Sequence, residues 1–283
     1  MSILSSLLGQ LDLEEIESNL FRGYSTLPGP PRVFGGQVIG QALIAASRTV
    51  DDRPCHSLHG YVLRPGDPSI PIVFEVDRIR DGRSFTTRRV VAIQKGKAIF
   101  NMSVSFQVQE EGLSHAVPMP DVPPPEECVD DTEAFRAHAD ELPEGVSNHM
   151  MRERPIEMRR VESHSFLKPE KKPPYQHAWL RARDTVPDDP HLHQCILAYA
   201  SDMGILSTCT LPHGKSFMTG LMTASLDHAM WFHRPFRVDE WILFAQDSPA
   251  AGGSRGFNRG MMFTQDGTLV ASVAQEGLIR DVS

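Results

Sequence analysis

The fold class is decided by Gly35-Gly-Gln-Val-Ile-Gly-Gln-Ala-Leu-Ile-Ala-Ala-Ser-Arg-Thr-Val50. This stretch is rich in small and apolar residues and contains no proline, which is typical of a helix buried on most of its faces. Four segments with the composition of β-strands follow it, separated by turn residues: His56–Leu63, Ile70–Arg80, Ser84–Gln94 and Ala98–Val108. A buried helix followed by antiparallel strands predicts an α+β unit.

The second half of the chain repeats this order. A second apolar helix is expected at Leu192–Met203. Strand-like segments follow it at Ala224–His233, Trp241–Asp247, Gly256–Thr264 and Leu269–Glu276. The pairs Arg64-Pro65 and Arg234-Pro235 occupy matching places after the first strand of each series. Order and spacing therefore predict two helix-plus-sheet units, at residues 1–110 and 156–283.

Prolines separate the two units. Of the 22 prolines in this chain of 283 residues, ten lie between Pro118 and Pro174. Because clustered prolines exclude helices and central strands, we expect residues 111–155 to form a surface linker with short elements at most. Two units of ordinary domain size account for the rest of the length.

The chain is acidic, with 28 Lys plus Arg against 36 Asp plus Glu and a formal charge of −8. This balance argues against a nucleic-acid partner, because phosphate binding requires a basic surface. A small anionic ligand would instead need a local basic patch. No apolar run approaches the roughly 18 residues of a membrane span. The N-terminus lacks the basic region and cleavage site of a signal peptide, so we expect a cytoplasmic protein.

Several segments resemble the acyl-CoA thioesterase II (TesB-type) family. They are Phe34–Leu43, His56–Asp67, Ser225–Phe236, and Thr264–Gly267 running into Ala274–Gly277. The resemblance covers nearly the whole chain and weakens only in the proline-rich middle. It implies a double hotdog fold, in which two tandem units each wrap a curved antiparallel sheet around a long helix. It also implies hydrolysis of fatty acyl-CoA to free fatty acid and CoA without a cofactor. The resemblance leaves the oligomeric state open, and we expect a homodimer or larger homo-oligomer because hotdog units commonly associate further.

The same resemblance implies a set of catalytic residues. The family holds the attacking water with an Asp, a Ser or Thr hydroxyl and a Gln, which fall on Asp202, Ser225 and Gln275. A carboxylate at the end of an apolar helix is partly desolvated, which makes it a better general base. The hydroxyl and the amide can hold a water at a fixed angle. Backbone N–H groups at Gly35-Gly36 or near Leu192 are candidates for binding the developing oxyanion.

The first unit carries only part of this set. The expected counterparts of Asp202 and Gln275 are about Ala45-Ala46 and about Val104, which have neither a carboxylate nor an amide. Only the serine is kept, as Ser57. We therefore expect one active site per chain, with the first unit supplying walls for the acyl chain or CoA.

Other residues are weaker candidates. His59, Met230 and Trp231 are candidates for substrate contact, although core packing and structural hydrogen bonds are the commoner roles of such strand residues. His228 and His233 alternate with apolar residues, and we expect both to be hydrogen-bonded structural histidines.

Three further patterns are better explained without chemistry. His191-Leu-His193 could begin a metal site, but no Cys, Asp or Glu completes it at a sensible spacing, so no metal is expected. Gly252-Gly-Ser-Arg-Gly256 matches the G-x-S-x-G pattern of serine hydrolases, but it leads into a strand-like run, so we expect a hairpin connection. The four cysteines form no CxxC, and a chain of this length needs no disulfide.

Two other functions stay open. A hotdog enoyl-thioester hydratase would usually carry an Asp and a His together on one helix, and no such pair follows Asp202 closely. A non-catalytic acyl-thioester binding protein would be expected to lose the Asp, Ser and Gln set, which is intact. Release of free thiol from acyl-CoA distinguishes a thioesterase from both.

Overall fold

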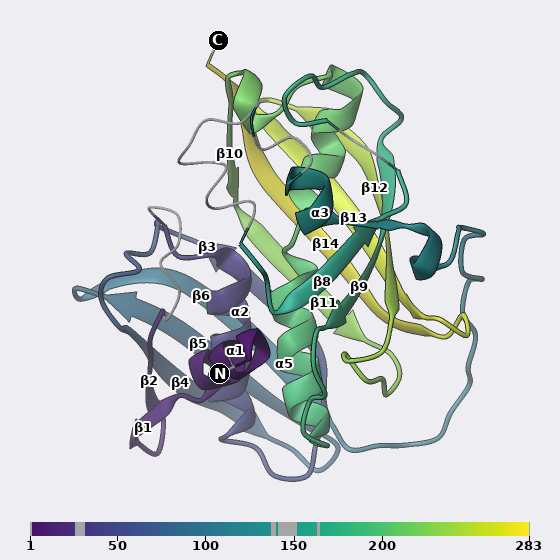
Figure 1. The fold of residues 1–283 in the computed structure, drawn as a ribbon. Helices are drawn as coiled ribbons and strands as arrows, with labels where there is room; N and C mark the ends of the chain where they lie inside the picture. The colour runs from purple at the N-terminus through teal and green to yellow at the C-terminus, as the bar shows by residue number, and fades with distance from the viewer. Residues whose placement is uncertain (1, 26–31, 137–139, 141–151, 163–164, 283) are drawn as a thin grey trace.

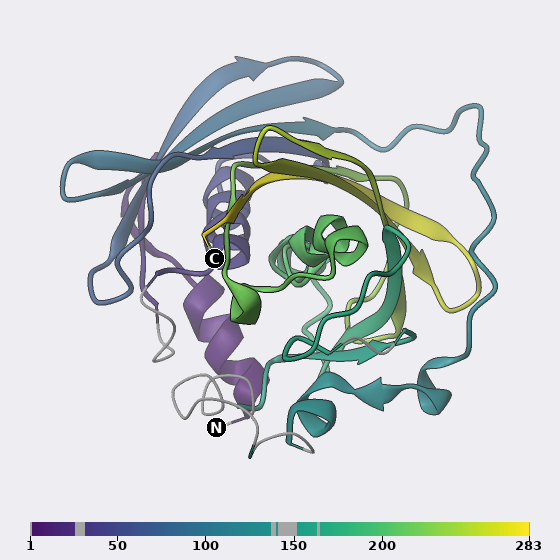
Figure 2. The same cartoon turned by 90° about the horizontal axis from the view of Figure 1, so that it is seen from above.

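One antiparallel sheet runs through both halves of the molecule (Figure 1). The computed structural model describes residues 2–25, 32–136, 140, 152–162 and 165–282. Within them, the sheet has 14 strands in the order β1-β2-β4-β5-β6-β3-β11-β14-β13-β12-β9-β8-β7, with β10 paired to β14. The sheet curves around the central helices, as Figure 2 shows from above. This architecture is the α+β double hotdog that the sequence predicts.

The first half contains the predicted helix and four predicted strands. They are α2 (Gly35–Ser47), β3 (Cys55–Val62), β4 (Ile72–Asp81), β5 (Phe85–Gln94) and β6 (Lys97–Gln107). Three elements before them have no counterpart in the prediction: α1 (Ile3–Leu11), β1 (Glu14–Glu17) and β2 (Leu20–Gly23). β2 pairs with β4, so the short hairpin extends the edge of the sheet.

The second half repeats the pattern and differs from the prediction at one strand. Its elements are α5 (Pro190–Ser201), β10 (Leu221–Ser225), β11 (Asp227–Phe232), β12 (Ile242–Gly252), β13 (Arg255–Thr264) and β14 (Leu269–Asp281). The single strand expected over Ala224–His233 is divided at Leu226, because β10 pairs only with β14 whereas β11 lies between β14 and β3. The elements that the sequence does not predict are β8 (Ile156–Arg160), β9 (Tyr175–Ala182) and the 3-10 helices η3 (Ile205–His213) and η4 (Phe217–Thr219).

The stretch expected as a linker contains short elements. Residues 108–124 have neither helix nor strand. They are followed by a 3-10 turn η1 (Pro125–Glu127), the two-residue strand β7 (Val129–Asp130) and α3 (Asp131–Arg136). β7 pairs with β8, so part of this stretch joins the sheet of the second half. Residues 137–139 and 141–151 of the stretch lie outside the described residues.

The G-x-S-x-G pattern lies in a hairpin, as predicted. β12 and β13 pair antiparallel up to Gly252 opposite Arg255, and the turn between them is Gly253-Ser254. Both turn residues have positive φ, 56° and 59°, as a tight two-residue hairpin turn requires. Ser254 is therefore not on the strand-to-helix turn that a serine nucleophile needs.

The two halves are related by an approximate twofold axis. They meet where β3 pairs with β11, and His59 lies opposite Ala229 in this pair. On the next strands outward, Ser103 of β6 lies opposite His59, and Ala274 of β14 lies opposite Ala229. Arg64 lies five residues after His59, and Arg234 lies five residues after Ala229, so the axis passes near this pair and relates β3 to β11 and β6 to β14.

The helices α2 and α5 pack against each other inside the curved sheet (Figure 2). A Cβ atom on Gly36 would lie 2.3 Å from the carbonyl oxygen of Tyr199, so only glycine allows this approach. Leu43 of α2 and Leu197 of α5 are fully buried in one hydrophobic core that draws on both halves. Burying such a side chain stabilises a fold by about 1.5–3 kcal/mol. The shared core makes the two halves one structural unit.

Candidate active site

Asp202 lies where the end of α5 meets the start of α2. It directly follows α5, and its Oδ2 atom accepts a hydrogen bond of 2.8 Å from the backbone N–H of Gly36. A Cβ atom on Gly35 would lie 2.7 Å from the same oxygen, so the double glycine is what lets the helix start approach the carboxylate. The N-terminus of a helix favours a negative charge, because its first N–H groups have no partner within the helix.

Ser225 and Gln275 form the second part of the site. Gln275 lies on β14 and is 1% exposed, and its Nε2–H donates to Oγ of Ser225 at the end of β10 over 2.8 Å. The other end of the amide meets a histidine, because Oε1 lies 2.6 Å from Nδ1 of His228 on β11. Two strands, β10 and β14, and the end of α5 therefore supply the predicted trio, and β11 adds His228 beside it.

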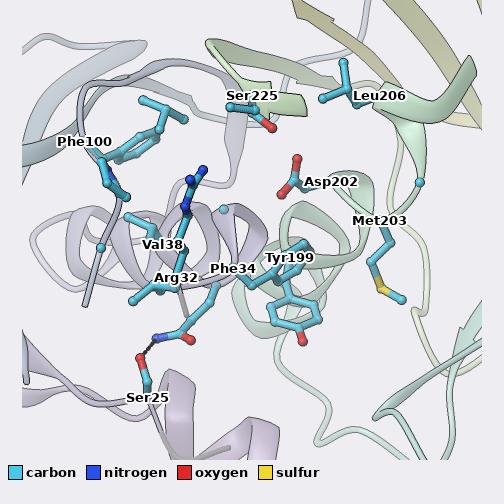
Figure 3. A pocket seen from close by; sticks show the side chains of 18 of the residues that line it. Ser25, Arg32, Phe34, Val38, Phe100, Tyr199, Asp202, Met203, Leu206 and Ser225 are labelled. Atoms are coloured by element: carbon cyan, nitrogen blue, oxygen red, sulfur yellow. Dashed lines mark hydrogen bonds between the residues drawn. The ribbon is translucent and has the colours of Figure 1, made fainter. Parts of the chain in front are cut away.

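All three predicted side chains line one cavity of about 840 Å³. Figure 3 shows the hydroxyl of Ser225 and the carboxylate of Asp202 pointing toward one another across it. The remaining wall is largely apolar and comes from both halves, with Val38, Phe100, Tyr199, Met203 and Leu206 among its residues (Figure 3). Gly35 also lines the cavity, so the start of α2 is part of its wall.

The environment of Asp202 makes its carboxyl group hold a proton more tightly. Burial raises its pKa, and this effect outweighs the opposing influence of His228, Gln275, the Gly36 N–H and Ser225. A carboxylate with a raised pKa is a stronger base that can still be ionised near neutral pH. The arrangement therefore suits a group that takes a proton from water.

Arginines are concentrated around the same cavity. Arg32, Arg64, Arg152, Arg154 and Arg160 line it. The carboxylates in its lining are Asp202 and Glu153. The acidic chain thus has the local basic patch that a small anionic ligand would need, and this patch borders the predicted site.

Three of the proposed substrate contacts lie elsewhere. Along β11 the side chains alternate, so Met230 points inward and is fully buried in the core, while Trp231 faces outward. His59 is exposed on the outer face, where its ring packs edge-on against Trp231 with the ring centroids 4.9 Å apart. None of the three lines the cavity. Trp231 and His59 therefore face away from the site, and Met230 is enclosed in the core beside it.

The two predicted sources of oxyanion-binding N–H groups, Gly35-Gly36 and the residues near Leu192, lie at different distances from the site. The N–H of Gly36 is directed at Asp202, so Gly35 is the member of the pair left to the cavity. Leu192 lies at the start of α5, whereas Asp202 follows the end of that helix. The residues near Leu192 are therefore at the wrong end of α5 to serve this site.

The sheet register identifies the counterparts of two site residues in the first half. Counting from the pairs around the twofold axis, Gln275 corresponds to Val104, which agrees with the prediction. Ser225 lies opposite Gly277, and the matching position in the first half belongs to Cys55, opposite Phe106. The prediction that Ser57 matches Ser225 is therefore wrong, because Ser57 lies seven residues before Arg64, whereas Ser225 lies nine residues before Arg234, as Cys55 does before Arg64.

The counterpart of Asp202 also differs from the prediction. Asp202 directly follows α5, and the residue that directly follows α2 is Arg48, not Ala45 or Ala46. Arg48 pairs with Asp12 at 2.6 Å and bonds to the chain near α1. In the described structure the first half thus carries no member of the trio, which strengthens the expectation of one site per chain.

His228 is the residue of the site whose place sequence reasoning missed. The prediction of a hydrogen-bonded histidine is confirmed, but the partner could not be foreseen, because contact with Gln275 depends on the pairing of β11 with β14. Burial lowers the pKa of His228, against the opposing effects of Asp202, Gln275 and Asp227, which favours a neutral ring. The other predicted structural histidine, His233, bonds to Ser272 on the exposed face.

The histidine pair at His191-Leu-His193 and the cysteines have structural surroundings. Among the described residues, no group of three or more His, Cys, Asp or Glu side chains is placed to hold a metal ion. His193 has its Nδ1 atom engaged with the backbone N–H of Val238, at 3.0 Å. The four cysteines are buried free thiols: Cys55, Cys128, Cys195 and Cys209.

Comparison with protein families decides the class of this protein. A family model described as acyl-CoA thioesterase matches residues 146–278, and a model of the acyl-CoA thioesterase N-terminal domain matches residues 25–107. The chain belongs to the acyl-CoA thioesterase family. The thioesterase is 41% identical over 280 residues to acyl-CoA thioesterase 2 of Haemophilus influenzae, with 98% of both chains covered. It is 42% identical to human acyl-coenzyme A thioesterase 8, covering 95% of this chain and 87% of the human one.

Solved structures agree with this assignment. The acyl-CoA thioesterase II TesB2 from Mycobacterium marinum is 44% identical, with a TM-score of 0.80 and coverage of 98% of this chain and 99% of that one. A dehydratase domain of PpsC from Mycobacterium tuberculosis shares the fold at 10% identity and a TM-score of 0.54, covering 96% and 99% of the two chains. Because one fold supports both reactions, the family match rather than the fold identifies the thioesterase as a thioester hydrolase acting on acyl-CoA.

In the part of the thioesterase that the structure describes, no helix is both long enough and apolar enough to cross a membrane.

Proposed function

We propose that this thioesterase hydrolyses fatty acyl-CoA to free fatty acid and CoA with a water activated by Asp202 and held by Ser225 and Gln275. The observation that carries the proposal is the convergence of these three side chains on one cavity from α5, β10 and β14. The apolar part of the wall, including Val38 and Phe100, suits an acyl chain.

The reaction follows from the chemistry of the trio. Asp202 takes a proton from the water while the water oxygen bonds to the thioester carbonyl carbon. The carbonyl electrons move to oxygen, and the N–H of Gly35 at the start of α2 is our proposed donor to this oxyanion. When the carbonyl re-forms, the C–S bond breaks and the CoA thiolate leaves, taking the proton back from Asp202. Ser225 and Gln275 hold the water in the direction of attack.

The pH dependence of hydrolysis tests the role of Asp202. The base works only when ionised, and its pKa is raised by burial, so activity must fall as the pH drops through this raised value. We expect the acidic limb of the kcat/KM profile to have its midpoint above the ordinary range of an aspartic acid. The profile is measured by thiol release at constant ionic strength, with stability checked at each pH. An acidic limb in the ordinary range would contradict a desolvated base.

The arginines around the cavity are proposed to bind the phosphates of CoA. Arg32 is exposed and extends into the cavity from the first half (Figure 3). Arg64 and Arg160 have other partners as well, since Arg64 bonds to the carbonyl of Ala98 at 2.6 Å and Arg160 pairs with Asp131 at 2.9 Å. Arg32 is therefore the clearest position at which to test an electrostatic contact with substrate.

Replacing Arg32 with alanine should raise KM for acyl-CoA and leave kcat unchanged. An exposed ion pair contributes roughly 0.5–1 kcal/mol, which corresponds to a rise of about 2- to 5-fold. The rise should shrink with salt and should vanish for acyl-pantetheine, which lacks the phosphates. Arg89→Ala is the matched control, because Arg89 pairs with Asp77 on the exposed surface and does not line the cavity. An equal rise in KM for both substrates would refute the phosphate contact.

A further inference from the structure

A buried chain of hydrogen bonds runs behind the candidate trio. Nε2 of His228 lies 2.8 Å from Oγ of Ser201, the residue next to Asp202 at the end of α5. Nδ1 of the same ring lies 2.6 Å from Oε1 of Gln275. Ser201, His228 and Gln275 are 0%, 1% and 1% exposed. The ring thus connects the helix that carries the proposed base to the amide that contacts Ser225.

The donors and acceptors in this chain of hydrogen bonds determine which way each hydrogen points. An amide oxygen can only accept a hydrogen bond, so Nδ1 of His228 must carry a hydrogen and donate it to Gln275. In a neutral ring Nε2 then accepts, and the hydroxyl of Ser201 is its donor. That hydroxyl also lies 2.8 Å from the carbonyl oxygen of Ala198, so two acceptors share its hydrogen. At the far end, Nε2–H of Gln275 donates to Ser225, whose own hydrogen is left for the water or Asp202.

The first half shows what the fold itself requires at these positions. His228 corresponds to Leu58 and Gln275 to Val104 across the twofold axis, and Leu58 lies opposite Val104 in the β3–β6 pair. Both are buried, at 0% and 1% exposure. A hotdog half therefore packs well with two apolar side chains here. A buried polar pair such as His228 and Gln275 is stable only if its polar atoms are hydrogen-bonded. In the second half, Ser201 and Ser225 provide the partners.

We propose that His228, held by Ser201, is a positioning residue for thioester hydrolysis, which fixes the amide of Gln275 so that its nitrogen faces Ser225. Without the histidine, the amide oxygen would lose the donor that holds it, and only the contacts of the other end with Ser225 and Asp202 would oppose an exchange of oxygen and nitrogen. An exchanged amide would accept from Ser225 and take the hydroxyl hydrogen away from the water. The role rests on the proposed function, since it matters only if the trio holds the water.

The first test compares two substitutions of His228. His228→Leu copies the residue of the first half and should fold, but it should lower kcat by about 10- to 100-fold with KM unchanged, as expected for a misdirected water. His228→Asn keeps an N–H donor near the position of Nδ1 and should recover most of the lost kcat. Equal kcat in His228→Leu and wild type, or no recovery in His228→Asn, would overturn the proposal.

Ser201 supplies the second test. If Ser201 acts only through the ring, Ser201→Ala should lower kcat in the wild type but should have no further effect in His228→Leu. If the losses of kcat in Ser201→Ala and His228→Leu were additive, the two residues would have independent structural roles, which would overturn the proposal. The tautomer gives a readout that does not depend on activity: nitrogen NMR of the His228 ring should show hydrogen on Nδ1 and a bare Nε2. Hydrogen on Nε2 alone would contradict the proposed direction of the chain.

Two controls show whether a negative result concerns the positioning role of His228 or the proposed function as a whole. His233→Leu removes a histidine–serine hydrogen bond of the same length, 2.8 Å to Ser272, on the exposed face, and should leave kcat and KM unchanged. Wild type and Asp202→Asn are measured in the same thiol-release assay. If the wild type released no thiol, the proposed function and the positioning role of His228 would both be refuted. If the wild type were active and His228→Leu equally active, only the positioning role would be refuted.

Discussion

Asp202→Asn is expected to lower kcat for acyl-CoA hydrolysis by about 10²- to 10⁴-fold, the range that a positioned general base contributes. Asparagine has nearly the same shape, and its oxygen can still accept from the N–H of Gly36. It cannot take a proton from water. The measurement is thiol release from acyl-CoAs of several chain lengths, with KM determined for each. KM should change little, because the group acts on the water rather than on substrate binding.

Stability distinguishes loss of the base from loss of the fold. Because the folded-state pKa of Asp202 is raised by burial, the ionised carboxylate destabilises the native state at pH values above that pKa. Asp202→Asn should therefore be at least as stable as wild type at neutral pH. Asp227→Asn is the matched control, since Asp227 accepts from the backbone N–H of Glu276 at 2.6 Å and does not line the cavity. Unchanged kcat in Asp202→Asn would remove the proposed mechanism.

Gly36→Ala should damage both the fold and the site. The new Cβ atom would lie 2.3 Å from the backbone carbonyl of Tyr199, and a backbone atom cannot rotate away as a side chain can. The helices must separate, at a cost of about 1–3 kcal/mol in the free energy of unfolding, which appears as a fall in Tm of several degrees. Since the Gly36 N–H also bonds to Asp202, kcat should fall at least about 10-fold.

The control for this change is the same substitution in another helix. Gly9 lies in α1 and is exposed, and a Cβ atom there would meet nothing within 4 Å. Gly9→Ala should therefore stabilise the protein by about 0.5–1 kcal/mol, the ordinary gain in a helix interior, and leave kcat unchanged. Thermal unfolding and thiol release are measured on both variants. If Gly36→Ala were as stable as Gly9→Ala, the close helix contact would not hold in solution.

The repeated architecture could be predicted because each half shows the pattern of a helix followed by strands in its local sequence. The small-residue helix at α2 and the strands β3–β6 have clear periodicity and turns, and the same order returns after α5. The strands β1 and β9 could not be predicted, because their local sequences are unfavourable for strands. β9 follows directly on Lys171-Lys-Pro-Pro174, and β1 is made of Glu14-Glu-Ile-Glu17, whose four residues are all exposed. Proline and charge suppress strand propensity, but pairing with a neighbouring strand overrides it.

The members of the site could be predicted only through the family resemblance, and their contacts could not be predicted at all. Gly36 and Asp202 are separated by 166 residues, and Ser225 and Gln275 by 50. No periodicity specifies such pairs, because they depend on how α2 packs against α5 and on the register of β10 with β14. Ser57 shows the limit clearly, since it lies seven residues before Arg64 whereas Ser225 lies nine before Arg234, and only the strand pairing places Cys55 at the matching position.

The approximate twofold axis has an evolutionary consequence. In a dimer of identical hotdog subunits, any substitution appears twice, so a residue that serves catalysis at one site is imposed on the other. Joining the halves in one polypeptide removes that constraint, because each position can mutate alone. Here Arg48 stands where symmetry would require a second Asp202, and Leu58 stands opposite Val104 where it would require a second His228 and Gln275. Under the proposed mechanism, this independence lets the second half carry the chemistry while the first half contributes to the wall of the cavity.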